Sequence, residues 1–396
     1  MESKTLHVAV VGAGPVGLAL ALHAARTLPQ ARITVFDARA LDHDEAEDPR
    51  TLALSLGSVQ LLKRLGAWNG AQAQAIAEVH VSQAQPSLAM PFGEPEVRIR
   101  AVDEAVPMLG AVLSYGAVVA PLQAAWLAES TRSPERLHSR FGTVVKALNP
   151  LADGVEVDAG SAERFDLAVV AEGGVFADQA RKALIASYRQ TAWVGHVTLS
   201  SGQPGVAFER FTRHGPAALL PLPPTDGGLL RAALVWCVPA DDDPVRELSS
   251  TQRLAVLNTL FPAAAGKLVG IGPLKDFPLG LNAERTLVHG RSVRIGNAAQ
   301  TLHPVAGQGL NLGLRDAYEL VDALHKAPTI AAALRRLEWR RAPDRWSAIL
   351  TTDFLARSFT WKAPGLATAR GLGLAALQLA RPLKSLLARQ MMFGRR

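Results

Sequence analysis

The chain has few of the residues on which several classes of protein depend. It has one cysteine, Cys237, in 396 residues, so it can form neither an internal disulfide nor a thiolate zinc site. We find no metal-ligand spacing of histidines, no pair of carboxylates and no serine nucleophile motif, so no bound metal is expected. Aromatic residues make up 6% and do not alternate with the basic residues near the C-terminus, which argues against a nucleic-acid surface.

Long apolar runs are scarce, and none has the pattern of a membrane span. Ala105–Ala128 carries no charge and is long enough to cross a bilayer, but prolines and glycines interrupt it. A buried strand followed by a helix fits this stretch better, with Pro121 at the start of the helix. Val8–Leu22 reads as a strand, a turn and a helix, and therefore not as a signal peptide.

Acidic residues are missing from the end of the chain. The net charge is +7, and Leu355–Arg396 contains eight basic residues and no acidic one. A last helix, with Pro382 in its first turn, has a leucine-rich face and basic residues off that face. This pattern fits the anionic surface of a membrane, and it equally fits a helix that packs on the body with its arginines in solvent. The apolar face comprises Leu383, Leu386, Leu387 and Met391.

The N-terminal region contains a glycine-rich turn between a strand and a helix. Leu6–Val11 is typical of a buried parallel strand, and Leu18–Leu28 is a good helix. A second strand, Ile33–Phe36, ends at Asp37, about twenty residues beyond the last glycine of the turn, which completes the dinucleotide-binding fingerprint. The turn and the helix start would hold a pyrophosphate, and Asp37 would take the ribose hydroxyls. The expected contacts are Gly12, Gly14, Val16, Gly17, Asp37 and Ala38.

A second glycine-rich segment follows a short strand at Ser292–Ile295. Its Gly307-Gln308-Gly309 turn opens a helix that continues to about residue 326. A helix start of this kind suits an anion or the electron-rich carbonyl edge of a reduced flavin. Pro304 is expected to hold the preceding loop near polyproline II geometry.

These motifs resemble a known family. The segment Gly296–Asp316 and the block Asp48–Ser55 resemble the FAD-contacting motifs of single-component flavin-dependent aromatic hydroxylases. The resemblance is closest to the ubiquinone-biosynthesis branch, and within it to the 2-octaprenyl-6-methoxyphenol hydroxylase group. The chain departs from the usual pattern with Asn297 and Glu172, where most members have aspartate. The resemblance implies FAD contacts at Arg50, Gln123, Asn297, Gly307, Gln308, Gly309, Leu310 and Asn311.

The resemblance and the order of elements predict an α/β fold, α+β overall. We expect a Rossmann-like FAD-binding domain with an inserted antiparallel-sheet substrate domain and C-terminal helices, as in class A flavoprotein monooxygenases of the para-hydroxybenzoate hydroxylase type. The expected parts of the FAD-binding domain are 1–76, 105–186 and 283–326. Those of the substrate domain are 77–104 and 187–282, and 327–396 forms a helical, basic, amphipathic C-terminal region.

One strand of the inserted sheet carries the expected substrate contacts. The run Phe208-Glu209-Arg210-Phe211 and the following Gly215–Leu222 resemble the ubiquinone branch in particular. Side chains alternate along a strand, so either Phe208 and Arg210 or Glu209 and Phe211 face the pocket. The expected contacts are Glu209, Arg210 and Phe211. A helix over about 243–260 is expected to interrupt the strands of this sheet.

The resemblance implies a monooxygenase that binds FAD non-covalently and uses NAD(P)H and O2. It would hydroxylate a prenylated phenol in ubiquinone biosynthesis through a flavin C4a-hydroperoxide. Pro304 would border the oxygen site. His303 is the one candidate here for proton transfer with the phenol, the alternative being a hydrogen-bonded loop residue.

The expected location is the cytoplasm, with peripheral binding to the inner face of the cell membrane and contacts with other ubiquinone-biosynthesis proteins. Two alternatives remain open. One is an FAD-dependent hydroxylase or dehydrogenase of a soluble aromatic compound, and the other is a non-catalytic, flavoprotein-like scaffold of a quinone-biosynthesis assembly.

Overall fold

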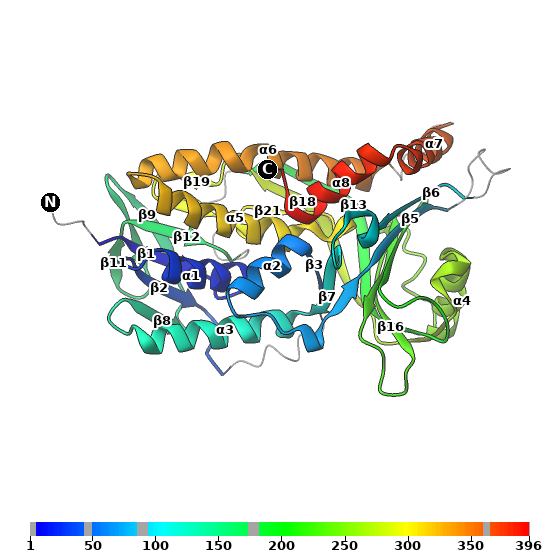
Figure 1. Cartoon of the computed structure of the whole chain (residues 1–396), viewed down its shortest axis with the longest axis horizontal. Helices are drawn as coiled ribbons and strands as arrows, with labels where there is room; N and C mark the ends of the chain where they lie inside the picture. Colours follow the sequence, from blue (N-terminus) through cyan, green and yellow to red (C-terminus); the bar gives the residue numbers. More distant parts are fainter. Residues whose placement is uncertain (1–4, 43–49, 85–93, 173–181, 359–364, 396) are drawn as a thin grey trace.

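The computed structural model describes residues 5–42, 50–84, 94–172, 182–358 and 365–395, and the statements below concern these residues. Two sheets lie side by side along the long axis of the molecule (Figure 1). The N-terminal half of the chain builds most of the first sheet, and the long helices α5 (Gln308–Lys326) and α6 (Ile330–Ser358) run along one side of it. The helix α4 (Ser250–Leu260) lies at the opposite end, beyond the second sheet.

The first sheet is parallel apart from one edge hairpin, and its central strands are buried on both faces. This agrees with the β-branched sequence of the first strand. Helix α1 (Pro15–Thr27) joins the first two of its strands in chain order, and α3 (Tyr115–Arg132) leads into another of them from the small sheet. In sheet order the strands are β19 (Val288–His289), β20 (Ser292–Arg294), β12 (Leu167–Val170), β1 (His7–Val11), β2 (Arg32–Asp37) and β8 (Leu137–Phe141).

The second sheet is mainly antiparallel, as expected for the insert, and two separate segments of the chain contribute to it. Its one parallel pair joins β14 to β5. In order along the sheet the strands are β21 (Gln300–Thr301), β18 (Lys275–Glu284), β13 (Lys182–Leu199), β16 (Leu230–Pro239), β15 (Pro216–Leu222), β14 (Val206–Phe211), β5 (Glu78–Gln83) and β6 (Glu96–Arg100), and β17 (Leu268–Ile271) also pairs with β13.

Smaller elements complete the fold. Strand β7 (Gly110–Ser114) pairs with β3 (Thr51–Ser55) and β4 (Gln74–Ile76). Strands β9 (Ala147–Leu151), β10 (Gly154–Asp158) and β11 (Ala162–Phe165) form a separate sheet. The remaining helices are α2 (Leu56–Arg64), α7 (Leu366–Leu379) and α8 (Arg381–Phe393). Among the described residues, no helix combines the length and the apolarity that crossing a bilayer requires.

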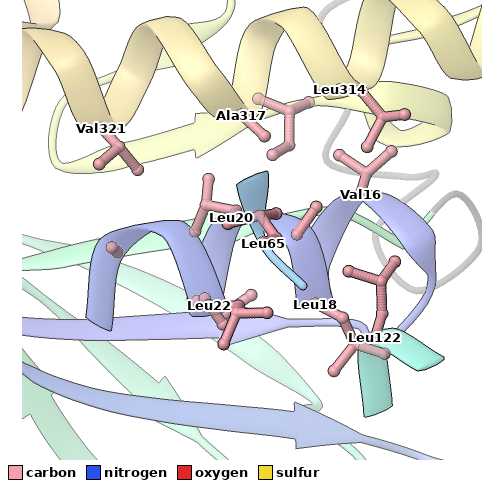
Figure 2. Packing of buried hydrophobic residues seen from close by; sticks show 14 of the residues in the cluster. Val16, Leu18, Leu20, Leu22, Leu65, Leu122, Leu314, Ala317 and Val321 are labelled. Carbon is pink, nitrogen blue, oxygen red and sulfur yellow. The ribbon is translucent and has the colours of Figure 1, made fainter. Parts of the chain in front are cut away.

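Helix α1 is apolar on nearly all sides because it is enclosed on nearly all sides. Figure 2 shows its Val16 and Leu20 directed toward Leu314 and Ala317 of α5, with Leu22 on the other side of the helix. The contact between α1 and α5 therefore belongs to the main core of the molecule.

Two expected helix starts are wrong. Helix α3 begins at Tyr115 and includes Pro121 in its interior, because the Ser114 side chain accepts a hydrogen bond from the Ala117 N–H and caps the helix six residues earlier than expected. Helix α4 begins at Ser250, later than expected, because Ser249 and Gln252 form a capping box there.

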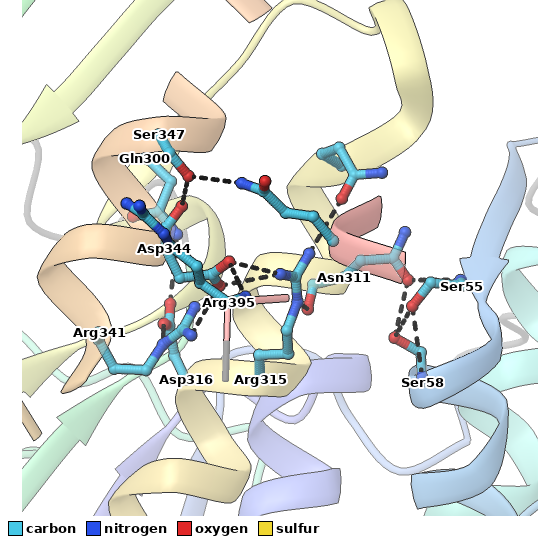
Figure 3. Close-up of polar contacts among 12 residues, drawn as sticks. Ser55, Ser58, Gln300, Asn311, Arg315, Asp316, Arg341, Asp344, Ser347 and Arg395 are labelled. Carbon is cyan, nitrogen blue, oxygen red and sulfur yellow. Dashed lines mark hydrogen bonds and ion pairs between the residues drawn. The ribbon is translucent and has the colours of Figure 1, made fainter. Parts of the chain in front are cut away.

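A buried ion network fastens α5 to α6 (Figure 3). Arg341 donates from Nε to Asp316 and from Nη1 to Asp344, both at 2.7 Å. Arg315 reaches Asp344 at 2.8 Å, and the backbone N–H of Arg395 donates to the same carboxylate. Burial opposes ionisation of Asp344, but Arg315 and Arg341 outweigh it and hold its pKa below the usual range. The C-terminus of the described chain is thereby tied to the helix pair.

The substitution Arg341→Met should lower the free energy of unfolding by about 3–5 kcal/mol, because two buried carboxylates lose their common cation. Its neighbour Arg340 pairs with Glu319 at the surface, and its side chain is 47% exposed. Arg340→Met should therefore cost only about 0–1 kcal/mol. Urea denaturation of both variants tests the difference, and equal losses would contradict the assignment of a buried network.

Candidate functional site

The turn after β1 contains two glycines that the chain itself requires. Gly12 has a φ of +104°, and a Cβ there would lie 2.8 Å from the Cβ of Glu172. A Cβ at Gly17 would lie 1.9 Å from the carbonyl oxygen of Gly12. These glycines let the strand, the turn and the helix pack closely. Burial and the nearby Asp37 charge raise the pKa of Glu172.

At two other glycines, close packing within the chain does not require the absence of a side chain. Gly14 has an ordinary φ of −75°, and the nearest atom to a Cβ there would be the Tyr115 hydroxyl at 3.6 Å. Gly309, in the first turn of α5, has no atom within 4 Å of the place of a Cβ. Both lie where a helix start leaves backbone N–H groups without helical partners. Open glycines at two helix starts form a cradle that a side chain would fill, so these positions fit the phosphates and the ring edge of a bound dinucleotide.

The two turns are neighbours in space although far apart in sequence. A Cβ at Gly296 would lie 3.3 Å from Val16, and one at Gly313 would lie 2.8 Å from both Val16 and the Gly296 Cα. Figure 2 shows Val16 of α1 and Leu314 of α5 at the same end of the two helices. The starts of α1 and α5 therefore border one region, as expected if they contact the same molecule.

The side chain of Asn311 joins a third segment to these two. Its Oδ1 accepts from the Ser55 N–H at 2.8 Å and from the Ser58 hydroxyl at 2.7 Å (Figure 3). Its Nδ2 donates to the carbonyls of Ala53 and Gly307. All four of its hydrogen-bonding positions are used, so a ligand contact by Asn311 is left to its backbone.

The carboxylate of Asp37 is buried and fully engaged. It accepts from the Ala13 N–H at 2.6 Å and from the N–H and Nε of Arg39 at 2.8 and 2.9 Å. Burial raises its pKa, but these hydrogen bonds outweigh burial and the net pKa is lowered. Contact between Asp37 and a ribose therefore requires the Arg39 guanidinium to move. The exposed Ala38 adjoins this place, and Gln123 donates to the Leu41 carbonyl in the same segment.

Tyr115 was not among the residues predicted from the sequence. This buried residue starts α3, its N–H donates to the Arg50 carbonyl at 2.9 Å, and its ring centroid lies 4.1 Å from the Arg50 guanidinium. Its hydroxyl interacts with Arg39 and faces the open space at Gly14. Tyr115 therefore connects the three predicted contacts Gly14, Asp37 and Arg50. The available signal was an aromatic residue directly after the capping Ser114.

His303 does not fit the proton-transfer role. It is buried, its Nε2 donates to Gln190 Oε1 at 2.9 Å, and its Nδ1 accepts from the Val305 N–H. Burial lowers its pKa to about 4, so the ring is neutral at pH 7. Both nitrogens have protein partners, which favours the alternative of a hydrogen-bonded loop residue.

The loop around Pro304 also differs from the expectation. Pro304 has φ −64° and ψ −11°, a helical conformation and not polyproline II. The Gly307 N–H donates to the Pro304 carbonyl, which closes a tight turn before α5. Asn297 is exposed in a short turn that packs beside the start of α5.

The structure decides which side of β14 faces the first sheet. Arg210 is buried on the α4 side, where Nε donates to the Leu260 carbonyl at 3.0 Å and Nη2 to Glu94 at 2.7 Å. Phe211 points the other way and packs with Val305, directly after Pro304. Glu209 and Phe211 therefore share the face toward the turn before α5, whereas Arg210 lies on the opposite face with Leu260 and Glu94.

A half-buried row crosses the sheet on this face. Glu209, Ala218, Val235 and Val194 are directly paired across β14, β15, β16 and β13. These four side chains are partly exposed, whereas most of their neighbours along the strands are buried. The row therefore borders accessible space. The row is apolar apart from the carboxylate of Glu209. It forms a wall that suits an apolar ring carrying one polar group.

His196 lies on the same face and was not predicted. Its Nε2 is 3.2 Å from the Thr51 hydroxyl, so it bridges the second sheet to the segment that follows Arg50. Burial and the nearby Arg231 lower its pKa, which favours the neutral ring. The contact joins the strand β13 of the apolar wall to β3, which pairs with β7 in the small sheet.

Comparisons with known sequences agree with this geometry. Residues 177–342 match the family described as "FAD binding domain". The chain is 30% identical to ubiquinone hydroxylase UbiL of Rhodospirillum rubrum, over 98% of this chain and 90% of that protein. It is 28% identical to 3-demethoxyubiquinol 3-hydroxylase of Escherichia coli, over 97% of both chains.

Comparisons with solved structures show the fold. HpxO of Klebsiella pneumoniae, complexed with FAD and uric acid, has a TM-score of 0.69 at 17% identity over 98% of this chain and 97% of that chain. The p-nitrophenol 4-monooxygenase PnpA of Pseudomonas putida has a TM-score of 0.69 at 17% identity over 99% of both chains. The fold is that of class A flavoprotein monooxygenases, as predicted.

The stability of the natural protein should depend more steeply on pH than that of the variant His303→Gln. Unfolded His303 takes up a proton near its ordinary pKa of about 6.5, whereas folded His303 does so only near about 4. The stability that neutral His303 contributes to folding is therefore complete above pH 6.5 and is lost as the pH falls from 6.5 to about 4. At the lower end of this range the free energy of unfolding has fallen by roughly 3 kcal/mol. His23, with a pKa also lowered to about 4, is present in both proteins and cancels. Denaturation at a series of pH values measures the effect, and parallel curves would contradict it.

Proposed function

Since the chain belongs to the family of FAD-dependent hydroxylases of ubiquinone biosynthesis, we propose that it hydroxylates the ring of a prenylated phenol with NAD(P)H as electron donor and O2 as oxygen source. The observation that carries the proposal is the pair of adjacent helix starts with open glycines at Gly14 and Gly309. They lie next to a sheet face that carries one carboxylate and meets the turn before α5 through the Phe211–Val305 contact. Bound FAD would supply the electron storage and oxygen activation that side chains cannot provide.

The residues around the two turns would hold the cofactor at opposite ends. The start of α1 at Gly14 would bind the pyrophosphate, with Tyr115 beside it and Asp37 and Arg39 near the adenosine ribose. The backbone N–H groups at the start of α5 would face the pyrimidine edge and stabilise negative charge there. The full proposed set is Gly12, Gly14, Val16, Gly17, Asp37, Ala38, Arg39, Arg50, Tyr115, Gln123, Asn297, Gly307, Gln308, Gly309, Leu310 and Asn311.

The wall of the second sheet would hold the substrate. Glu209 would accept a hydrogen bond from the phenolic hydroxyl and so orient the ring, while Phe211 and the apolar row exclude water from it. Pro304 would border the oxygen site, because Phe211 packs against Val305. Within the substrate class, the resemblance of the Phe208–Leu222 and Gly296–Asp316 segments makes 2-octaprenyl-6-methoxyphenol our first candidate.

The function is tested in two ways. A strain without the gene should accumulate an unhydroxylated quinone precursor, and mass analysis of its quinone intermediates identifies the ring position. The purified yellow protein should consume NAD(P)H and hydroxylate prenylated phenols in preference to short ones. A normal quinone profile, or a preference for small soluble aromatics, would refute the proposal. We further propose that the protein works in the cytoplasm beside the membrane and the other enzymes of this route.

The substitution Gly14→Val should abolish FAD binding and leave the fold intact. Within the chain, a side chain at Gly14 meets only the Tyr115 hydroxyl, but it would occupy the place of the pyrophosphate. The visible absorption spectrum and circular dichroism of the purified variant give the two readouts. Yellow and active variant protein would refute the assignment.

The substitution Glu209→Gln should leave FAD binding unchanged and reduce hydroxylation by about tenfold, because a neutral amide oxygen is a weaker hydrogen-bond acceptor for the phenol than a carboxylate. Hydroxylated product should fall more than NAD(P)H consumption does. The same change at Glu156, which hydrogen-bonds Asn149 away from the wall, serves as the control and should have no effect. If Glu209→Gln still forms one hydroxylated product for each NAD(P)H consumed, the result would contradict a contact between Glu209 and the phenol.

A further inference from the structure

We propose that α7 and the first half of α8 dock the protein on an anionic membrane surface, beside the edge of the sheet that forms the substrate wall. The inference rests on the proposed function, because it concerns how a prenylated substrate enters. It assigns the contact to particular residues and states how the docked helices meet the site.

Four leucines form an exposed surface on these helices. Leu372 is 58% exposed, Leu379 83%, Leu383 56% and Leu386 63%. We call them the leucine surface. The other exposed residues of α7 are alanine and glycine, so the outer side of this helix has no polar side chain among its exposed positions. Single exposed leucines are common, but a run of them over two consecutive helices marks an interaction site.

The inner sides of both helices are fixed to the body, so the leucine surface has a defined direction. The Arg98 N–H of β6 donates to Gln378, and Lys384 donates to the Arg98 carbonyl, both at 3.0 Å. Ala388 and Met392 of α8 are buried with Leu56. The last helix thus packs on the body by one side and presents its leucines on the other. The sequence allowed either a helix on an anionic membrane surface or a helix packed on the body. In this proposal the two alternatives apply to different faces of the same helix.

The charge of these helices favours an anionic membrane over a second copy of the chain as the partner of the leucine surface. Arg381 and Arg389 are exposed on α8, where Arg389 also pairs with Glu104 at 3.3 Å and keeps 62% of its side chain exposed. The chain has no acidic residue from Leu355 to its end. A second copy seated on the same surface would bring arginines against arginines. Anionic lipid headgroups would instead pair with the arginines while the leucines enter the acyl region.

The position of α7 links the surface to the substrate wall. Figure 1 shows α7 beside β6 at the far end of the second sheet. Gln83 of β5 donates to the Ala367 carbonyl of α7 at 3.0 Å. Gln83 and Val81 are paired with Phe211 and Glu209 of β14. One strand therefore separates α7 from the proposed phenol contact, and a prenyl chain leaving the ring along β5 reaches the docked helices.

Vesicle flotation tests the proposal. The natural protein with bound FAD should float with vesicles of phosphatidylglycerol and phosphatidylcholine and not with phosphatidylcholine alone. The variant Leu379→Gln with Leu383→Gln should lose about tenfold or more in vesicle affinity. Trp339→Gln is the matched control, because Trp339 is 84% exposed on α6, outside the leucine surface.

The outcomes separate this inference from the proposed function. Turnover of a short soluble phenol should be equal in all three proteins, while turnover of a long-chain phenol supplied in anionic vesicles should fall only in the leucine variant. Failure of the natural protein to float, or floating that the leucine variant retains, would overturn the docking surface and leave the hydroxylase proposal standing. Dimers that dissociate in the leucine variant, without flotation of the natural protein, would assign the surface to a second copy. Absence of turnover of both the short and the long-chain phenol in the natural protein would instead count against the function.

Discussion

The contact of Val16 with Gly296 and Gly313 is the constraint on which the candidate site depends. Any side chain at Gly313 would meet both Val16 and the Gly296 backbone at 2.8 Å, so the starts of α1 and α5 can be this close only with glycine there. Helix starts carry unpaired N–H groups and partial positive charge. Bringing two of them to one region produces a place for a long, electron-rich molecule, and the open glycines at Gly14 and Gly309 keep that place free of side chains.

The rest of the fold holds this arrangement from two directions. Asn311 ties the segment after Arg50 to the start of α5 through three hydrogen bonds, and a buried ion network ties α5 to α6. From the other side, His196 and the Phe211–Val305 contact set the position of the second sheet. The wall and the glycine turns can therefore keep a fixed spacing, which selective oxidation of one ring position requires.

Local patterns in the sequence predicted the parallel sheet, the glycine turns and the antiparallel insert, because spacing of apolar residues and glycines determines them directly. Side-chain partners could not be predicted in the same way. The choice between Glu209 and Arg210 needed the register of β14, and the loss of His303 as a proton-transfer group needed its distant partner Gln190. Tyr115 was missed because its role comes from Arg39, Arg50 and Gly14, which only the folded chain brings together.

The most direct test of the account is an experimental structure of the protein with FAD bound. We predict the pyrophosphate at the start of α1 next to Gly14, and the pyrimidine edge of the flavin at the start of α5 next to Gly309, with the ring system facing Glu209. A structure in which either helix start points away from the cofactor would contradict the central claim.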